Sequence, residues 1–336
     1  TARLSQWVER NSNIWQSPAY LSLLKSITAA VDVSLVAVDK NDQIAGYFPI
    51  LAKNGTVGVV ANSLPFFGSH GGILGDSEVV AGSLCDRVLE YLDVGAFTSF
   101  TMIDDPFGNQ CNITSRIAQT DYRIGQYTQL SEDVEHHLLP HLHAKVRYGI
   151  RQARASSLKV VRNTTDFSTL RRLHRKHMQQ IGGTPKPNSF FDYFPKFFEE
   201  GQDYDTWAAV DASNKVHGML LVLYRSNVAE YYMPVWDRDG AYPHILYGLI
   251  IEAMTFAAQE RECSRWNWGG TWPSQHGVYR FKSRWNAKDV EYAYRTMKSP
   301  EIEIAQLQAA RRRNEYPFFY VYPEQPRDAH DDDLHP

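Results

Sequence analysis

The chain reads Trp266-Asn267-Trp268-Gly269-Gly270 and, after a short loop, Gly277-Val278-Tyr279-Arg280-Phe281-Lys282. The first run is typical of a strand that ends in glycines, where a ligand or another segment can approach the backbone closely. The second run interleaves cationic and aromatic residues, and a lysine in such surroundings can stabilise an oxyanion that forms on an attacked carbonyl. Alternatively, Lys282 lies along a strand edge and extends its ammonium group into water.

Length and composition predict a two-domain globular protein. The chain has 336 residues, of which 43% are hydrophobic and 22% charged, so it exceeds a typical domain of roughly 100–200 residues and can fill real cores. The net charge of −3 argues against a dedicated nucleic-acid-binding protein and against DNA as a partner, but it leaves a local basic face open. We expect a monomer.

The cysteines and the hydropathy pattern favour a cytoplasmic location. Cys85, Cys111 and Cys263 are scattered, so they predict neither a disulfide framework nor a metal site and suit a reducing compartment. No run reaches the roughly 18 apolar residues that a membrane span needs. The first residues also lack the layout of a signal peptide.

The predicted elements repeat in two halves, each with a helix, antiparallel strands, a further helix and a further strand. The first half has helices at 17–25 and 77–92 and strands at 33–38, 44–51, 57–60 and 96–103. The second half has helices at 142–156, 166–180, 189–199, 243–260 and 302–313 and strands at 158–161, 206–211, 216–224, 228–236, 265–268 and 290–297. This order favours an α/β fold with mixed α+β sheets over a doubly wound parallel sheet.

The same order sets the expected domain boundaries. We place an N-terminal domain at 1–135 and a C-terminal domain at 136–315. Residues 316–326, with a short strand at 318–321, are expected to return to the first domain. The acidic tail at 327–336 is expected to be disordered.

A basic window lies between His141 and His177. It holds ten lysines and arginines and a single acid, Asp166; the basic residues are Lys145, Arg147, Arg151, Arg154, Lys159, Arg162, Arg171, Arg172, Arg175 and Lys176. Arg147, Arg151 and Arg154 recur at helical spacing and share one face. Such a face suits the phosphates of a nucleotide-linked substrate or an RNA acceptor stem, and a solvated charged surface is the alternative.

Several common catalytic motifs are absent. The sequence has no GxGxxG, P-loop or HExxH pattern. Gly68-Ser69-His70-Gly71 is similar to a nucleophile turn, but it lacks the G-x-S-x-G spacing and the strand-to-helix context of a hydrolase. We therefore expect no hydrolase-type nucleophile there.

Together these segments resemble the FemAB family, which is built from two tandem acetyltransferase-like (GNAT) domains. The matching segments are residues 12–25, the Gly-rich loop 64–72, the strand end at 103–106, the basic helix 147–153, the tyrosines 231 and 232, and the signature at 267–270 with 277–282. The resemblance spans most of the chain. The long helical arm of some members has no counterpart here, and residues 237–241 are at best a degenerate version of a coenzyme A pyrophosphate loop.

The resemblance implies transfer of an aminoacyl or acyl group to an amine. The family's best-known members take the amino acid from aminoacyl-tRNA and extend the peptide of peptidoglycan precursors, with the acceptor in a groove between the domains. The implied catalytic residues are Lys282, Asp105 and Tyr231. The implied substrate-binding residues are Lys25, Phe281, Arg147, Arg151, Arg154, Tyr232, Trp268 and Tyr279. No metal and no cofactor are expected besides the donor substrate.

Three functions remain open at this point. The first is an aminoacyl-tRNA-dependent transferase acting on a cell-envelope or peptide-type precursor. The second is a transferase that uses acyl-CoA or an acyl carrier and acts on an amino sugar or small amine; the degenerate loop at 237–241 counts against coenzyme A. The third is a non-catalytic protein that only binds such a precursor.

Overall fold

The computed structural model describes residues 2–64, 66–109, 116–163, 167–237, 240 and 242–322. These residues form two compact units. The first unit holds the described residues of 1–124, 272–274 and 290–322, and the second holds those of 125–271 and 275–289. Among the described residues, no helix combines the length and apolar character that crossing a membrane requires.

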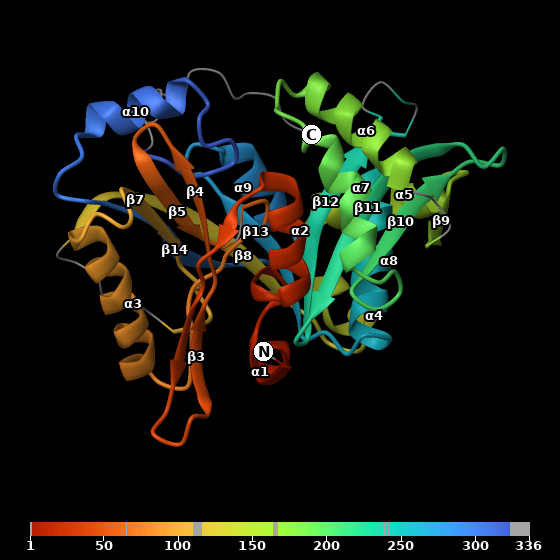
Figure 1. Cartoon of the computed structure of the whole chain (residues 1–336). Coiled ribbons are helices and arrows are strands. Elements are labelled where there is room, and N and C mark those ends of the chain that lie inside the picture. Colours follow the sequence, from red (N-terminus) through yellow and green to blue (C-terminus); the bar gives the residue numbers. More distant parts are fainter. Residues whose placement is uncertain are drawn as a thin grey trace. The chain divides into compact units, whose positions relative to one another are not determined.

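The first unit contains a mixed sheet, a small antiparallel sheet and covering helices (Figure 1). Its helices are α1 (Ala2–Asn11), α2 (Pro18–Thr28), α3 (Glu78–Asp93) and α10 (Ile304–Arg312), with a 3-10 turn η1 (Ile14–Gln16). Its strands are β1 (Val31–Asp32), β2 (Leu35–Val38), β3 (Ile44–Phe48), β4 (Ile50–Gly55), β5 (Gly58–Ser63), β6 (Leu74–Gly75) and β7 (Ser99–Ile103).

Local sequence explains where these elements begin and pair. The Ser17 side chain caps α2, whose first residue is Pro18, and the Ser77 side chain accepts from the Val80 amide at the start of α3. Strands β2 and β3 pair as the expected antiparallel hairpin. Apolar residues of α3 lie in one hydrophobic cluster with residues of β4 and β7, so burying this helix face closes the core of the unit.

The second unit has helices on both faces of its strands (Figure 1). Its helices are α4 (Val134–His137), α5 (Ala144–Ala155), α6 (Phe167–Gln180), α7 (Asn188–Phe197), α8 (Ile245–Gln259) and α9 (His276–Ser283), with a 3-10 turn η2 (Leu139–His141). Its strands are β9 (Lys159–Arg162), β10 (Tyr204–Val210), β11 (Val216–Arg225), β12 (Val228–Trp236) and β13 (Arg265–Thr271). Two strands have residues in both units: β8 (Ile117–Gln129) and β14 (Lys288–Lys298).

Strand alternation separates the two faces of the second unit. Leu220 and Val222 of β11 join the buried cluster that α5 and α8 complete. On the other face, the ring of Phe190 on α7 lies beside Tyr232, and α6 runs along β12. Successive side chains on a strand point to opposite faces, so β11 and β12 serve both layers.

Both units contain the same arrangement, an antiparallel pair followed by a helix and a parallel strand. In the first unit, β4 pairs antiparallel with β5, and β7 follows α3 to pair parallel with β5. In the second, β11 pairs antiparallel with β12, and β13 follows α8 to pair parallel with β12. The predicted mixed α/β fold with two similar units is confirmed.

Several local expectations differ from the structure. The segment that contains Lys282 forms helix α9 and not a strand edge, and the long strand β8 was not anticipated. Residues 318–321 form no strand; the Asn62 side chain accepts from the Tyr320 amide at 2.6 Å and donates to its carbonyl at 2.8 Å. The positive φ of Phe318 breaks the extended geometry that a strand needs.

The chain also returns to the first unit earlier than expected. Residues 290–298 of β14 belong to the first unit, and Tyr294–Lys298 pair antiparallel with β7. Residues 136–315 therefore do not form one compact body. The sequence could not predict this, because the pairing of strands that are far apart in the chain depends on the whole fold and not on local pattern. The predicted tail at 327–336 lies outside the described residues, as do Arg238, Asp239 and Ala241 of the loop at 237–241.

The cysteine prediction also needs correction. Cys85 on α3 is disulfide-bonded, whereas Cys263 is a buried free thiol. The scattered sequence positions did not predict a disulfide, because spacing along the chain does not report distance in space. The cysteines therefore give no argument for a reducing compartment.

Candidate active site

Lys282 is buried at the end of β13. Helix α9 turns back after this strand and brings the Lys282 ammonium group against the strand's last residues. Its Nζ donates to Thr271 Oγ1 at 2.7 Å and to the carbonyls of Gly270 at 3.2 Å and Gly269 at 3.3 Å. The side chain is only 5% exposed, and Gly269 has a φ of +71°, which favours glycine. The ammonium group of the lysine predicted from sequence is therefore buried and hydrogen-bonded, and it does not extend into water.

Burial lowers the pKa of Lys282 to about 7. Desolvation disfavours the charged ammonium, and nearby carbonyl oxygens only partly replace water. Near neutral pH the group can therefore both donate and accept a proton, which an ordinary surface lysine cannot do.

Aromatic rings from β13 and α9 pack against one another. Trp268 lies with its ring centroid 6.2 Å from that of Phe281 and 5.6 Å from that of Trp285. The Trp268 Nε1 donates to Thr128 Oγ1 at 2.9 Å. Trp268 and Phe281, both predicted to bind substrate, therefore pack together in the apolar core that links β13 to α9.

The parallel pair β12–β13 positions the strand end. The register between the strands covers Val228–Glu230 and ends at Glu230 opposite Asn267. The Asn267 Nδ2 donates to both Glu230 carboxylate oxygens, at 3.0 and 2.9 Å, and its Oδ1 accepts from the Gly269 amide at 3.0 Å. Glu230, which sequence reasoning missed, thus holds the Gly269 turn; an acid on a strand otherwise rich in apolar residues was the available signal.

The two predicted tyrosines lie on opposite faces of β12. The Tyr231 ring is 4.9 Å from Trp268, and burial raises its pKa, so its hydroxyl stays protonated. Tyr232 is the extra residue of a bulge, because Val222 pairs with Tyr231 and Leu221 pairs with Met233. Tyr231 therefore lies beside Trp268 in the apolar cluster that α5 and α8 complete, whereas Tyr232 lies beside Phe190 of α7.

Tyr232 instead faces a second lysine that sequence reasoning missed. The Lys186 Nζ lies 5.0 Å from the Tyr232 ring centroid, and burial lowers the Lys186 pKa to about 8. The Lys186 amide donates to His174 Nε2 at 3.0 Å. Burial and the Lys186 charge lower the His174 pKa to about 4, so this histidine is neutral at pH 7.

Asp105 lies at the end of β7 in the first unit, beneath the Gly-rich loop. Its carboxylate accepts from the Phe107 amide at 2.9 Å and from Asn13 Nδ2 at 3.2 Å, and its Oδ1 lies 3.2 Å from His70 Nδ1. Burial acts to raise the Asp105 pKa, but these hydrogen bonds and the His70 charge outweigh it and lower the pKa. A carboxylate stabilised in this way is a weak proton acceptor.

His70 forms a buried pair with Asp105. The Asp105 carboxylate faces Nδ1 of the imidazole, as the carboxylate of a catalytic triad faces its histidine. The Gly68-Ser69-His70-Gly71 run, which does not fit a nucleophile turn, thus places His70 beside Asp105. In the sequence, the Asp105-Pro106 pair at the end of β7 was the sign of this site. The Gln16 Nε2 holds the loop by donating to the Gly71 carbonyl at 2.8 Å.

The remaining predicted binding residues differ in their surroundings. Lys25 on α2 is 45% exposed, with its Nζ 3.8 Å from Asp32. The Tyr279 hydroxyl on α9 donates to Asp289 Oδ2 at 2.6 Å. Neither contact lies at the Lys282 ammonium group.

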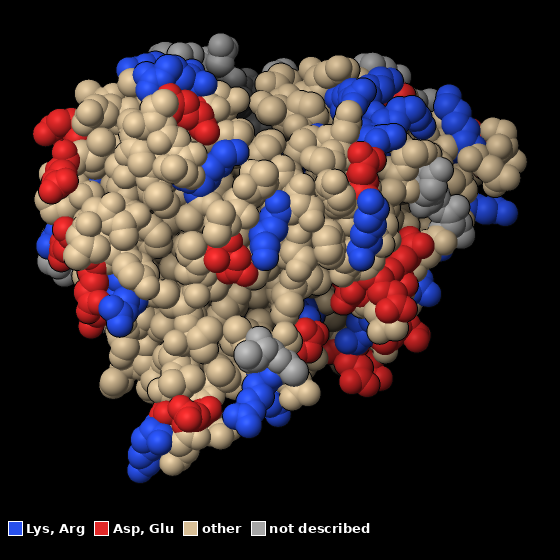
Figure 2. Space-filling view, viewed as in Figure 1, with Lys and Arg blue, Asp and Glu red and all other residues tan. Residues whose placement is uncertain are grey.

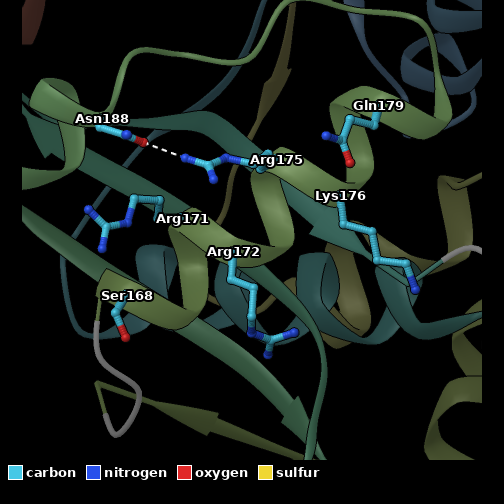
Figure 3. A pocket seen from close by; sticks show the side chains of 7 residues that line it. All are labelled: Ser168, Arg171, Arg172, Arg175, Lys176, Gln179 and Asn188. Atoms are coloured by element: carbon cyan, nitrogen blue, oxygen red, sulfur yellow. Dashed lines mark hydrogen bonds between the residues drawn. The ribbon is translucent and has the colours of Figure 1, made fainter.

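The predicted basic face of α5 is largely occupied by contacts within its own unit. The Arg147 guanidinium donates to the carbonyl of Pro140 at 3.0 Å. Arg154 forms ion pairs with Glu135 and Glu252. Arg151 is exposed. The cations that line a surface pocket belong instead to α6 (Figure 3).

The fold is shared with solved structures of low sequence identity. The structure of FemX matches with a TM-score of 0.63 and 12% identity, over 87% of this chain and 94% of that one. L-PGS from Bacillus licheniformis matches with a TM-score of 0.55 and 9% identity, over 94% and 97%. A tandem GNAT protein from the clavulanic acid biosynthesis pathway matches with a TM-score of 0.52 and 13% identity, over 90% and 94%. The resemblance to tandem GNAT proteins is thus confirmed at the level of the fold.

No protein-family model and no curated protein matches this chain.

Proposed function

We propose that this protein is an N-acyltransferase that moves an aminoacyl or acyl group from an ester or thioester to an amine. The observation that carries the proposal is Lys282, buried at the end of β13 with its pKa lowered to about 7. The shared fold with FemX and with a tandem GNAT protein supports this reaction class.

In the proposed reaction the amine nitrogen forms a bond to the carbonyl carbon, and the ester C–O or thioester C–S bond breaks. The proton that leaves the nitrogen ends on the departing oxygen or sulfur, so no covalent enzyme intermediate is needed. Negative charge builds on the carbonyl oxygen before the bond breaks. A protonated Lys282 in a buried site of low dielectric stabilises that charge more than water does.

The geometry of Lys282 suits a hydrogen-bond donor that can exchange one acceptor oxygen for another. Its contacts to Gly269 and Gly270 are 3.3 and 3.2 Å, longer than the 2.7 Å contact to Thr271. The longer contacts are the weaker ones, so the ammonium group can exchange one of them for a substrate oxyanion while Thr271 keeps it in place.

We further propose that an aminoacyl-tRNA is the donor and that the acceptor amine belongs to a cell-envelope or peptide-type precursor. The basic pocket on α6 supports a donor with several phosphates. Coenzyme A is the second candidate, which the fold shared with a GNAT protein favours. Purified protein should be incubated with charged tRNA or with acyl-CoA in the presence of amine acceptors, and the products identified by mass.

Ribonuclease treatment separates the donors. Product that disappears after ribonuclease treatment supports the RNA-borne donor, whereas product that forms from acyl-CoA and resists ribonuclease supports coenzyme A. Absence of product with every donor, alongside measurable binding of a precursor, would contradict the enzymatic proposal.

A further inference from the structure

The outward face of α6 carries a concentrated positive charge. The helix packs inward through Leu170, Leu173, His174 and His177, which are buried. Its outward positions hold Arg171, Arg172, Arg175 and Lys176, and its sequence contains no acid. Figure 2 shows lysine and arginine side chains gathered over this helix.

These cations line a pocket with a volume of about 480 Å³. Ser168 and Gln179 mark its ends along α6, and Asn188 at the start of α7 closes one edge (Figure 3). Every residue that lines the pocket is polar or charged and four of them are cations, so the pocket suits an anion.

The cations are only partly neutralised. Arg171 pairs with Asp192 at 3.0 Å, Lys176 pairs with Asp237 at 2.7 Å, and Arg175 donates to the neutral Asn188 Oδ1 at 2.7 Å. Within the described part of the chain, Arg172 forms no ion pair. Exposed ion pairs of this kind contribute little stability, so phosphate oxygens can replace the carboxylates at small cost.

The length of the pocket distinguishes a strand of phosphates from a single diphosphate. Ser168 and Gln179 are separated by about 16 Å along the helix axis, at roughly 1.5 Å per residue. Each strand of a nucleic-acid duplex carries one phosphate per about 3.4 Å of helix axis, so this length spans about five of them. A diphosphate would occupy little more than one helical turn.

We propose that the outer face of α6 binds the phosphodiester backbone of the RNA that carries the acyl donor. This inference rests on the proposed transferase function and assigns its donor contact to α6 and not to the basic helix α5. Arginine suits the task because its planar fork donates two parallel hydrogen bonds to a phosphate.

Binding of a fluorescein-labelled RNA hairpin to the full chain, measured by anisotropy at several salt concentrations, tests this inference. The double variant R172Q/R175Q should bind about tenfold more weakly, because each charge-assisted hydrogen bond contributes on the order of tenfold in affinity or less when exposed. The slope of log affinity against log salt should fall by about 1.4–1.8, the contribution of two phosphates.

Two control variants separate α6 from general charge effects. R87Q removes an exposed arginine from α3 of the first unit and should leave binding unchanged. R151Q removes the exposed arginine of α5 and should weaken binding less than the α6 variant. Equal binding by R172Q/R175Q and wild type, or equal weakening by R87Q, would overturn the inference. Competition by coenzyme A or inorganic pyrophosphate at the same phosphate concentration as RNA would also overturn it, since the site would then be a diphosphate site.

The same measurements distinguish this inference from the proposed function. RNA binding through α6 without transfer to any amine would leave the binding site standing and contradict the transferase. Transfer from acyl-CoA by a protein that does not bind the hairpin would support the transferase function and contradict the RNA-binding site on α6.

Discussion

Replacing Lys282 with methionine tests the proposed mechanism most directly. Methionine keeps an unbranched apolar stem of similar length but removes the ammonium group. If Lys282 stabilises the oxyanion, K282M should lower kcat by about 10²–10³, the usual effect of removing one oxyanion donor.

The structure also predicts the effect of K282M on stability. The substitution leaves the Gly269 and Gly270 carbonyls and the Thr271 hydroxyl without their donor. An unsatisfied buried group costs about 1–3 kcal/mol, and removal of a buried ammonium offsets part of this cost. Folded domains have about 5–15 kcal/mol of stability, so the variant should remain folded and its lost turnover should report on chemistry.

The pH dependence separates a proton donor from a proton acceptor. Because the pKa of Lys282 is about 7, a donor role predicts that kcat/KM falls as the pH rises above 7. The variant K282R, whose guanidinium stays protonated, should lose this descending limb. A rate that rises through pH 7 would instead assign the base role to Lys282.

The lowered pKa also makes a prediction for stability. Burial lowers the Lys282 pKa from 10.5 to about 7, so between these values the unfolded chain binds more protons than the folded one. Stability therefore increases with pH across this window, and K282M should flatten that increase.

Steady-state kinetics and thermal unfolding should be measured side by side, with K298M as the matched control. Lys298 also donates to backbone carbonyls, those of Ser299 and Ile302, but lies in the first unit. Its variant should change stability by a similar small amount and leave turnover unchanged. Near wild-type turnover of folded K282M, or an equal loss in K298M, would refute the oxyanion role.

The Gly-rich loop and the C-terminal segment provide further tests by thermal unfolding. G72A should destabilise the protein by about 1–3 kcal/mol, since the φ of Gly72 is +91° and a Cβ would lie 2.8 Å from Asp105 Cβ. On α3, a Cβ at Gly82 meets nothing within 4 Å, so G82A should stabilise the protein by up to about 1 kcal/mol. Equal effects of the two variants would contradict this reasoning. The lowered pKa of the Asp105 carboxyl contributes stability that is present above its unfolded-state pKa and is lost as the pH falls through its folded-state pKa. D105N should remove this contribution, so the stabilities of variant and wild type should converge at low pH. N62A should release Tyr320 and speed proteolysis of the C-terminal segment, and unchanged cleavage would show that other contacts hold it.

Local patterns in the sequence predicted much of the secondary structure. The β-branched runs and turn residues before residue 60 predicted the hairpin, because alternation and turn chemistry act within a few residues. The capped start of α3 was also clear, since Ser77 acts on an amide three residues away. Helix α9 was missed because a glycine and a short length hide its periodicity.

The candidate site was only partly predictable. Lys282, Trp268 and Phe281 stood out because cationic and aromatic residues cluster in sequence. Lys186 and Glu230 did not, because their partners come from other elements of the fold.

The Trp266–Lys282 stretch shows what each level decided. The sequence by itself determined the residue types: glycines that end a strand, aromatic rings beside it and a lysine shortly after. Only the tertiary structure decided that α9 folds back to bury the Lys282 ammonium against Gly269, Gly270 and Thr271, because burial depends on every element packed around the group. That burial lowers the pKa to about 7 and turns an ordinary lysine into a candidate catalytic group.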